Sequence, residues 1–393
     1  MLMTINSLPA PEIYRDPKRW VWWFSLGVPA LMGLGPLLML WQGDPKMLWW
    51  PLVFLYLAVP LADALLGEER SNPPESAVAQ LEADAYYRFI TYALVPVLWA
   101  AFVFAAWFVA SHDLPWHAWI AMVLNAGAVG GFGINVAHEL GHKHNRWERW
   151  LALVTLAPSG YGHFTAEHNR GHHAEVATPH DSASSRMGES IWRFVWREMP
   201  GGAVRAWRYE VQRLKAQGHS VWGWHNQILQ GLAITGALWL VLVLWLGWVV
   251  LPFLLAVSVW TNFQLTSANY VEHYGLLRHK LADGHYERCQ PRHSWNSNHI
   301  VSNWILFHLQ RHADHHAHAA RRYQALRHFD DAPQLPSGYA GMFLLAYVPP
   351  LWFAVMNPRL IDAVGRDPAR INFAMGKREA LCRQYGLRLA AQT

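Results

Sequence analysis

The stretch WHAWIAMVLNAGAVGGFGINVAHELGH, residues 116–142, joins a long apolar run directly to a pair of histidines. Its apolar part, 116–137, has the roughly 20 residues that a transmembrane helix requires. If the helix continues past the membrane, His138 and His142 are four positions apart and share one face, with Cβ atoms about 5–6 Å apart. The stretch therefore predicts a membrane span that ends in a pair of metal ligands.

Apolar runs of similar length recur along the 393 residues, and 53% of the chain is hydrophobic. Only 15% of residues are charged, whereas soluble domains have about 25%. The 24 Trp are typical of membrane-interface anchors. We predict an all-α integral membrane protein with six spans, at about 20–41, 47–66, 89–110, 116–137, 228–246 and 248–270. A further run, 339–356, is broken by two prolines, which favours a tucked or interfacial segment over a seventh span.

The distribution of Lys and Arg predicts the orientation of these spans. The short turns at 42–46 and 111–115 and the corner near Gly247 contain one Lys and no Arg, whereas the other loops are rich in both. By the positive-inside rule, both termini and a cap formed by about 138–227 and 271–393 are expected in the cytoplasm. We interpret residues 1–393 as one unit. The net charge of +5 fits such loops and gives no indication of nucleic-acid binding.

Nine histidines outside the apolar runs form three clusters and one isolated site. They are His138 and His142; His168, His172 and His173; His312, His315 and His316; and His273. His168 and His172 also share a face if their segment is α-helical, and an adjacent His173 or His316 can then reach a neighbouring ion. Nine imidazoles exceed the four to six ligands of one ion, so the pattern indicates a dinuclear site.

An all-imidazole ligand set suits iron, copper, zinc or nickel. Zinc has no redox chemistry, so an oxygenase requires iron or copper. His138-Glu-Leu-Gly-His142 also matches the HExxH motif of zinc peptidases, but a peptidase leaves the other clusters unexplained. A metal transporter is a further alternative, although transporters place their ligands near the membrane midplane.

Metal-bound histidines usually donate their second N–H to a carboxylate or a carbonyl group. Carboxylates close to the clusters in sequence are Glu139, Glu167, Asp181, Glu272 and Asp314. Ion pairing with the many arginines is the alternative role for each. Histidines near the clusters that could support them are His144, His163, His293, His299, His308 and His318, whereas His219, His225, His279 and His285 are expected to be solvated.

Residues 189–215 interleave Arg and Lys with Trp, Phe and Tyr, and Pro200-Gly-Gly interrupts them. This pattern predicts a pair of amphipathic helices lying on anionic lipid headgroups. A docking face for an acidic electron carrier is the other interpretation, because opposite charge steers such encounters. Both roles are compatible.

Taken together, these motifs resemble the integral-membrane alkane monooxygenase family, within the wider group of three-histidine-box membrane desaturases and hydroxylases. The resemblance covers nearly the whole chain. It rests on Asn72-Pro-Pro-Glu75, His138-Glu-Leu-Gly-His-Lys143, Tyr161-Gly-His-Phe164, Glu167-His-Asn-Arg-Gly-His-His173, Ala177-Thr-Pro179, Ser185-Arg-Met-Gly-Glu-Ser190, Leu265-Thr-Ser-Ala-Asn-Tyr270, Glu272-His-Tyr-Gly-Leu276, Ser294-Trp-Asn-Ser-Asn-His299 and Leu309-Gln-Arg-His-Ala-Asp-His-His316. Ala313 replaces a small polar residue that is common in the third box of the family.

The resemblance implies a centre of two non-haem iron ions held by the nine histidines. It implies terminal hydroxylation of medium-chain n-alkanes with O2, in the inner membrane of a bacterium. The electrons would come from rubredoxin, itself reduced by an NADH-dependent rubredoxin reductase. A membrane desaturase, or a hydroxylase of fatty acyl groups or aromatic side chains, is the alternative.

Burying an alkane is worth about 0.8 kcal/mol per CH2, and membrane lipid already supplies this free energy. The task left to the protein is orientation, for which a narrow channel between the spans suffices. Leu55 in the second span is the residue we expect to line this channel and to limit chain length.

Overall fold

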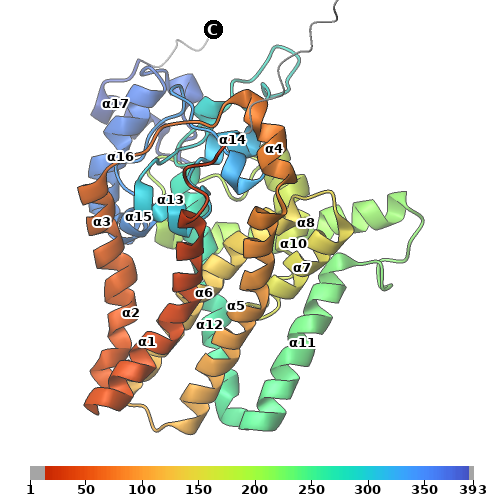
Figure 1. Cartoon of the computed structure of the whole chain (residues 1–393). Coiled ribbons are helices and arrows are strands. Elements are labelled where there is room, and N and C mark those ends of the chain that lie inside the picture. Colours follow the sequence, from red (N-terminus) through yellow and green to blue (C-terminus); the bar gives the residue numbers. More distant parts are fainter. Residues whose placement is uncertain (1–13, 389–393) are drawn as a thin grey trace, which may run out of the picture.

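The computed structural model describes residues 14–388, and all six apolar runs fold as helices long enough to cross a bilayer (Figure 1). This number confirms the six predicted spans. The candidate spans are Val21–Gln42 (η1, Val21–Leu26, and α1, Gly27–Gln42), Pro45–Leu66 (η2, Pro45–Trp49; α2, Trp50–Val53; η3, Phe54–Ala58; α3, Val59–Leu66), Ala85–Ser111 (α5), Trp116–Gly141 (α6), Gln227–Leu246 (α11) and Trp248–Glu272 (η6, Trp248–Val250, and α12, Leu251–Glu272).

Polar side chains fix where several spans begin. The Asp84 carboxylate accepts a hydrogen bond from the backbone N–H of Tyr86 at the start of α5. The Asn226 side chain accepts from the N–H groups of Ile228 and Leu229 at the start of α11. Such caps satisfy donors that have no partner inside the helix. At the far end of α1, Gly43 has a φ of 71°, the left-handed conformation that commonly ends a helix.

Helices α6 and α12 are in close contact along their length because α6 presents glycines to α12. A Cβ atom added at Gly127, Gly130 or Gly131 would lie closer than van der Waals contact to Trp260, Thr261 or Gln264 of α12, respectively. Small residues allow this close approach in membrane helices. The two helices that end in His138 and His273 are therefore held in a fixed relative position.

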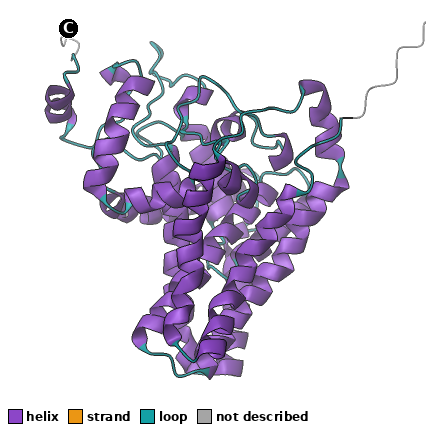
Figure 2. Cartoon of the chain, turned by 60° about the vertical axis from the view of Figure 1, so that its left-hand side comes forward, coloured by secondary structure: helices purple, strands orange, loops and turns teal. Residues whose placement is uncertain are grey.

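The remaining helices and loops gather at one end of the spans (Figure 2). Within residues 14–388 the cap contains isolated β-bridges but no strand. Its helical segments are η4 (Glu75–Ala77), α4 (Val78–Ala83), α7 (Arg146–Leu156), α8 (Phe164–Glu167), η5 (His168–His172), α9 (His173–Glu175), α10 (Ile191–Ala216), η7 (Pro291–His293), α13 (Ile300–Ile305), α14 (His312–Ala317), η8 (Tyr323–Ala325), α15 (Tyr339–Ala346), α16 (Pro349–Ala363), η9 (Pro368–Arg370) and α17 (Arg378–Tyr385).

Two expectations about the cap are tested here. The pair of helices predicted around Pro200 is wrong, because α10 continues through this proline. Phe194 and Ala206 are buried on either side of Pro200 and hold both halves against the cap, which outweighs the loss of one backbone hydrogen bond. In the 339–356 run, α15 and α16 meet at an angle of 119°, so this segment does not form a straight seventh span.

Candidate metal centre

Four parts of the chain bring the nine predicted histidines together. His138 lies in the last turn of α6, and His142 directly follows that helix. The segment η5–α9 provides three more, His273 directly follows α12, and α14 provides the last three. The imidazoles form two groups, and in each group the candidate ligand atoms all lie within 4.8 Å of one another.

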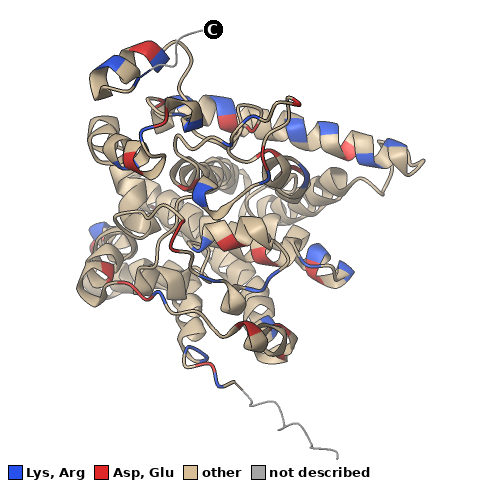
Figure 3. Ribbon diagram, turned by 90° about the horizontal axis from the view of Figure 1, so that it is seen from above, with Lys and Arg blue, Asp and Glu red and all other residues tan. Residues whose placement is uncertain are grey.

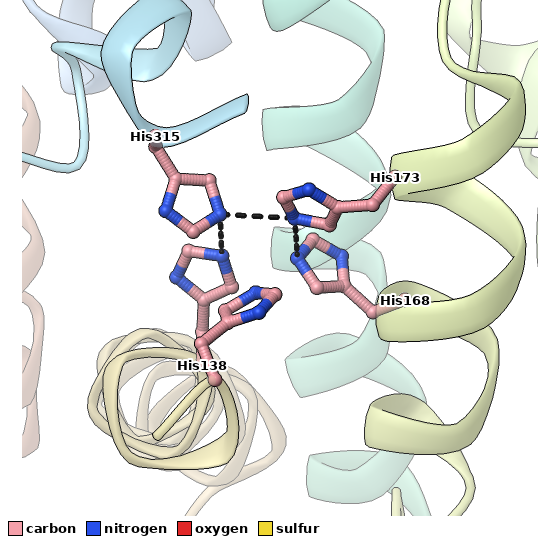
Figure 4. A group of neighbouring side chains, drawn as sticks. His138, His168, His173 and His315 are labelled. Carbon is pink, nitrogen blue, oxygen red and sulfur yellow. Dashed lines mark hydrogen bonds between the residues drawn. The ribbon is translucent and has the colours of Figure 1, made fainter. Parts of the chain in front are cut away.

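The first group contains His138, His142, His168, His173 and His315. The Nε2 atom of His315 lies 2.8 Å from that of His138 and 3.0 Å from that of His173. The Nε2 atoms of His173 and His168 are 3.1 Å apart. Figure 4 shows these rings turning their nitrogens toward one another from three separate helical segments.

The second group contains His172, His273, His312 and His316. The Nε2 atom of His312 lies 3.2 Å from that of His273 and 2.9 Å from that of His316. The rings of His172 and His316, which come from different segments, have centroids 4.9 Å apart. The four rings therefore also converge on one point.

These spacings fit metal coordination. Two imidazole nitrogens at about 2.1 Å from one ion lie about 3 Å apart when their bonds meet at right angles. Within residues 14–388, the buried Nε2 atoms of His142 and His172 have no hydrogen-bond partner. A bound ion would satisfy both atoms, which otherwise carry the cost of an unpaired buried polar group. Both groups therefore have the geometry and the donor chemistry of a metal site.

Most of the histidine rings are held in the neutral form that metal binding requires. Burial lowers the pKa of seven of the eight histidines beyond the spans, and the pKa of His273 falls to about 3. His172 is the exception. Burial lowers its pKa most strongly, but the charge and hydrogen bond of Asp181, together with the charges of Glu167 and Glu272, outweigh burial and raise the pKa above the usual value.

Two of the five predicted carboxylates contact the imidazoles. Asp181 Oδ2 lies 3.0 Å from Nδ1 of His172, so it accepts a hydrogen bond from the side of the ring that faces away from the group. Glu272 Oε2 lies 3.3 Å from Nε2 of His312 and so faces the converging nitrogens. The hydroxyl of Tyr339 donates to Oε1 of Glu272 at 2.8 Å. Asp181 thus lies on the outer side of its ring, whereas Glu272 lies on the inner side of its group.

The other three carboxylates are paired with cations, and among the described residues they have no hydrogen bond or ion pair with any of the nine histidines. Glu139 Oε1 lies 2.9 Å from Nζ of Lys143, and Glu167 lies 3.1 Å from Nε of Arg205. Burial raises the pKa of Glu167 to about 7. Asp314 pairs with Arg321 at 2.8 Å and accepts a hydrogen bond from the ring of His318.

The remaining histidines lie outside both groups. His219, His225, His279 and His285 are exposed, as predicted. Among those near the clusters, His308 packs against Trp22, and His293 lies 3.2 Å from the carboxylate of Glu287. His163, whose pKa is lowered to about 4 by burial, lines a small polar cavity beside His168 and His172.

An apolar cavity, about 870 Å³ when its open end is included, connects the spans with the two groups. Leu55 lines it, as do His138, His168 and His312 at its inner end. The hydroxyl of Tyr56 donates to the side chain of Gln264 at 2.7 Å across this wall. Sequence reasoning missed the contribution of α15, from which Tyr339, Ala340 and Phe343 line the cavity. The only signal was the apolar run 339–356, whose position in the fold its composition does not reveal.

A bundle of membrane-spanning helices, capped by histidine groups that can hold metal, defines the class of histidine-rich membrane desaturases and hydroxylases. Residues 113–346 match the fatty acid desaturase family model. An alkane 1-monooxygenase of Ectopseudomonas oleovorans is 48% identical over 96% of this chain and 94% of its own length. Those of Pseudomonas putida and Alcanivorax borkumensis are 46% identical, each over 96% of this chain and 93% of their own length. The chain belongs to the alkane 1-monooxygenase family and is a multi-pass membrane enzyme.

Proposed function

We propose that this enzyme hydroxylates the terminal carbon of medium-chain n-alkanes with O2 and two electrons from rubredoxin, which an NADH-dependent reductase reduces. Two non-haem iron ions would be held by the two histidine groups. The balanced reaction is RH + O2 + 2 e⁻ + 2 H⁺ → ROH + H2O. The printed names of the relatives support the alkane and the monooxygenation.

The observation that carries this proposal is the cavity between the spans, whose inner end is formed by His138, His168 and His312. Apolar side chains from α1, η3 and α15 surround its length, so an alkane fits where a polar substrate would lose hydration. Because the bilayer already removes the alkane from water, the wall adds mainly orientation. The wall presents one end of the alkane to the metal groups and excludes water from these groups.

Iron, when bound, would supply the redox chemistry that activates O2. In this proposal His138, His142, His168, His173 and His315 hold one ion, and His172, His273, His312 and His316 hold the other. The lowered pKa values of rings such as His168 and His273 keep these rings unprotonated and ready to bind. Asp181 fixes the ring of His172 through its outer nitrogen, and Glu272 adds a carboxylate on the inner side of the second group.

We also propose that the cap and the metal groups face the cytoplasm, with the protein in the inner membrane of a bacterium. Lys and Arg are spread over the cap when it is viewed from above (Figure 3). The turns at the opposite end of the spans contain Lys46 as their single such residue. The positive-inside rule supports this orientation, which also gives a reduced carrier protein access to the cap.

Desaturation of a fatty acyl chain is the second candidate, because the matching family model is that of fatty acid desaturases. Octane, dodecane and a fatty acyl substrate, each supplied with O2 and the reduced carrier, separate the candidates by product analysis. A terminal alcohol from the alkanes supports hydroxylation. A new double bond in the acyl substrate, with no alcohol from the alkanes, supports desaturation instead.

The decisive experiment measures metal content and activity on the same purified protein. We expect about two iron ions per chain, a number set by the two groups that can each hold an ion, and 1-octanol formation with rubredoxin and its reductase. His273→Ala is expected to lose iron and to abolish turnover, whereas His279→Ala, an exposed control, leaves both unchanged. One zinc ion per chain, or no transition metal at all, would overturn the proposal.

A further inference from the structure

A basic groove, unused by the proposed reaction, lies beside the metal centre. It is a hollow of about 1880 Å³ between α7, η5, α10 and the start of α11. Its lining includes Gly141, the last residue of one candidate span, and Gln227, the first residue of another. The groove therefore lies at the depth where two spans leave the hydrocarbon core, which is the layer of lipid headgroups. We call it the arginine groove.

Four guanidinium groups line the arginine groove, from Arg146, Arg149, Arg170 and Arg213. One carboxylate, that of Glu210, pairs with Arg170 at 2.9 Å and with Arg213 at 2.6 Å. Four positive charges against one negative charge leave an excess of three, so the groove favours an anion.

The other two arginines have no carboxylate partner among residues 14–388. Arg149 donates through Nη1 to the carbonyl oxygens of Lys143 and His144, which carry no net charge. Arg146 is exposed and makes no side-chain hydrogen bond within the described chain. These two side chains can therefore contact a phosphate without first breaking an ion pair. Guanidinium groups bind phosphate oxygens strongly and with defined geometry.

An aromatic pair lies next to these charges. Trp147 and Trp150 stack with ring centroids 5.0 Å apart, and they are 55% and 47% exposed. Trp is enriched where a membrane protein meets the headgroup layer. Leu153, one turn further along α7, also lines the groove. The groove thus combines cations for a phosphate with an apolar wall for glycerol and the beginning of an acyl chain.

The arginine groove also shares a wall with the first histidine group. Asn169, which lines the groove, donates from its side chain to the carbonyl of Gly141 at 3.0 Å. These two residues directly adjoin His168 and His142. A ligand in the groove would therefore stabilise the packing of the two segments that carry these imidazoles, since a ligand of the folded state raises stability.

We propose that the arginine groove is a binding site for the headgroup of an anionic phospholipid. Its depth in the membrane, its charge excess and its exposed Trp pair together favour a lipid over a soluble acidic protein. Arg146 and Arg149 contact the phosphate, and the Trp pair covers the glycerol region. Lipid bound there stabilises the cap beside the first histidine group, independently of the reaction that the centre performs.

The test places the full-length protein in nanodiscs of phosphatidylcholine alone or with phosphatidylglycerol. We expect phosphatidylglycerol to raise the melting temperature and to be retained in native mass spectra. Arg146→Gln with Arg149→Gln is expected to weaken lipid affinity roughly 30-fold, from the attraction of two arginines near an anionic surface. Arg146→Gln alone, which breaks no internal hydrogen bond, is expected to weaken it about fivefold.

The matched control is Arg193→Gln with Arg208→Gln, which removes the same charge from exposed positions of α10 outside the groove. It is expected to keep the lipid-dependent shift in melting temperature. The proposal would be overturned if the control and groove variants lost lipid affinity equally. It would also be overturned if the melting temperature were the same in both lipids. Unchanged lipid binding combined with weaker binding of reduced rubredoxin would also overturn it, because the groove would then dock the carrier. Neither the lipid binding nor the melting assay requires substrate turnover.

Discussion

The carboxylate of Asp181 lies 3.0 Å from the ring of His172, the one histidine beyond the spans whose pKa is raised. Burial alone would raise the pKa of Asp181, but His172 and the hydroxyl of Ser184 hold it well below its usual value. The carboxylate therefore stays charged and accepts the Nδ1–H of the ring. This bond leaves Nε2 of His172 as the free nitrogen directed to the metal.

Asp181→Asn is expected to weaken metal binding by the second histidine group about 10–100-fold, as the loss of such a partner typically does. The carboxylate charge orients the ring of His172 and increases its basicity. The amide of Asn lacks this charge. Titration of the metal-free protein with Fe(II) measures the change. Asp331→Asn, at an exposed position, is the matched control and is expected to bind as the unmodified protein does. Equal affinity in both variants would show that this hydrogen bond has no such role.

The metal-free protein is expected to lose stability in mild acid. The folded-state pKa of His273 is about 3, whereas the usual value is about 6.5. The unfolded chain then binds protons that the folded chain cannot, so stability is fully present above about pH 6.5 and falls below it. Each buried neutral ring contributes about 1.4 kcal/mol per pH unit in this range, while His172, with its raised pKa, acts in the opposite sense.

Chemical unfolding of chelator-treated protein between about pH 7.5 and 5.5 measures this slope, a window that spans the ordinary pKa of histidine. His273→Gln is expected to flatten it, because one buried imidazole is removed. The exposed variant His279→Gln is the control and keeps the full slope. A stability that is constant over this range would contradict the buried, neutral state of the rings.

The nine histidines and their i, i+4 spacing were enough to predict that they gather, but not how they divide. His138 and His142 do lie in one group, as α-helical spacing predicts. His168 and His172 do not, so that pairing is wrong. The segment His168–His172 is a π-helical turn, in which residues five apart align, and this places His168 with His173 instead. Nothing in the local sequence marks such a turn.

The spans were predictable because a length of apolar residues is a local property, whereas the cavity wall is not. Tyr339 and Phe343 reach the cavity because α15 packs against α12 and η3. The contact depends on tertiary packing over a long distance in sequence, from Tyr339 to Glu272 for example. The glycines of α6, in contrast, are a local feature that permits close helix packing, and they lie against α12.

Gly130→Val is expected to destabilise the protein by about 1–3 kcal/mol, the usual cost of overpacking a closely packed interior. A Cβ at this position would overlap the side chain of Thr261, which is itself fully buried. Thermal unfolding in detergent measures the loss. Gly236→Val in α11 is the matched control, because no atom lies within 4 Å of a Cβ there. A melting temperature lowered equally in both would attribute the effect to helix propensity rather than to the α6–α12 contact.

Leu55→Trp is expected to reduce activity on dodecane more than on octane. Leu55, Val28 and Ile305 line both the inner cavity and an outer hollow between α1, η3 and α13, so they lie where the two spaces adjoin. The larger indole narrows this point, and a long alkane must extend past it while a short one need not. A misfit of one methylene group is worth about 10–200-fold in kcat/KM. The ratio of kcat/KM for the two alkanes measures the effect free of changes in enzyme amount.

Leu57→Trp is the control, since Leu57 belongs to the same helical turn but is 64% exposed and lines neither space. An unchanged ratio in Leu55→Trp, or an equal change in Leu57→Trp, would remove Leu55 from the substrate path.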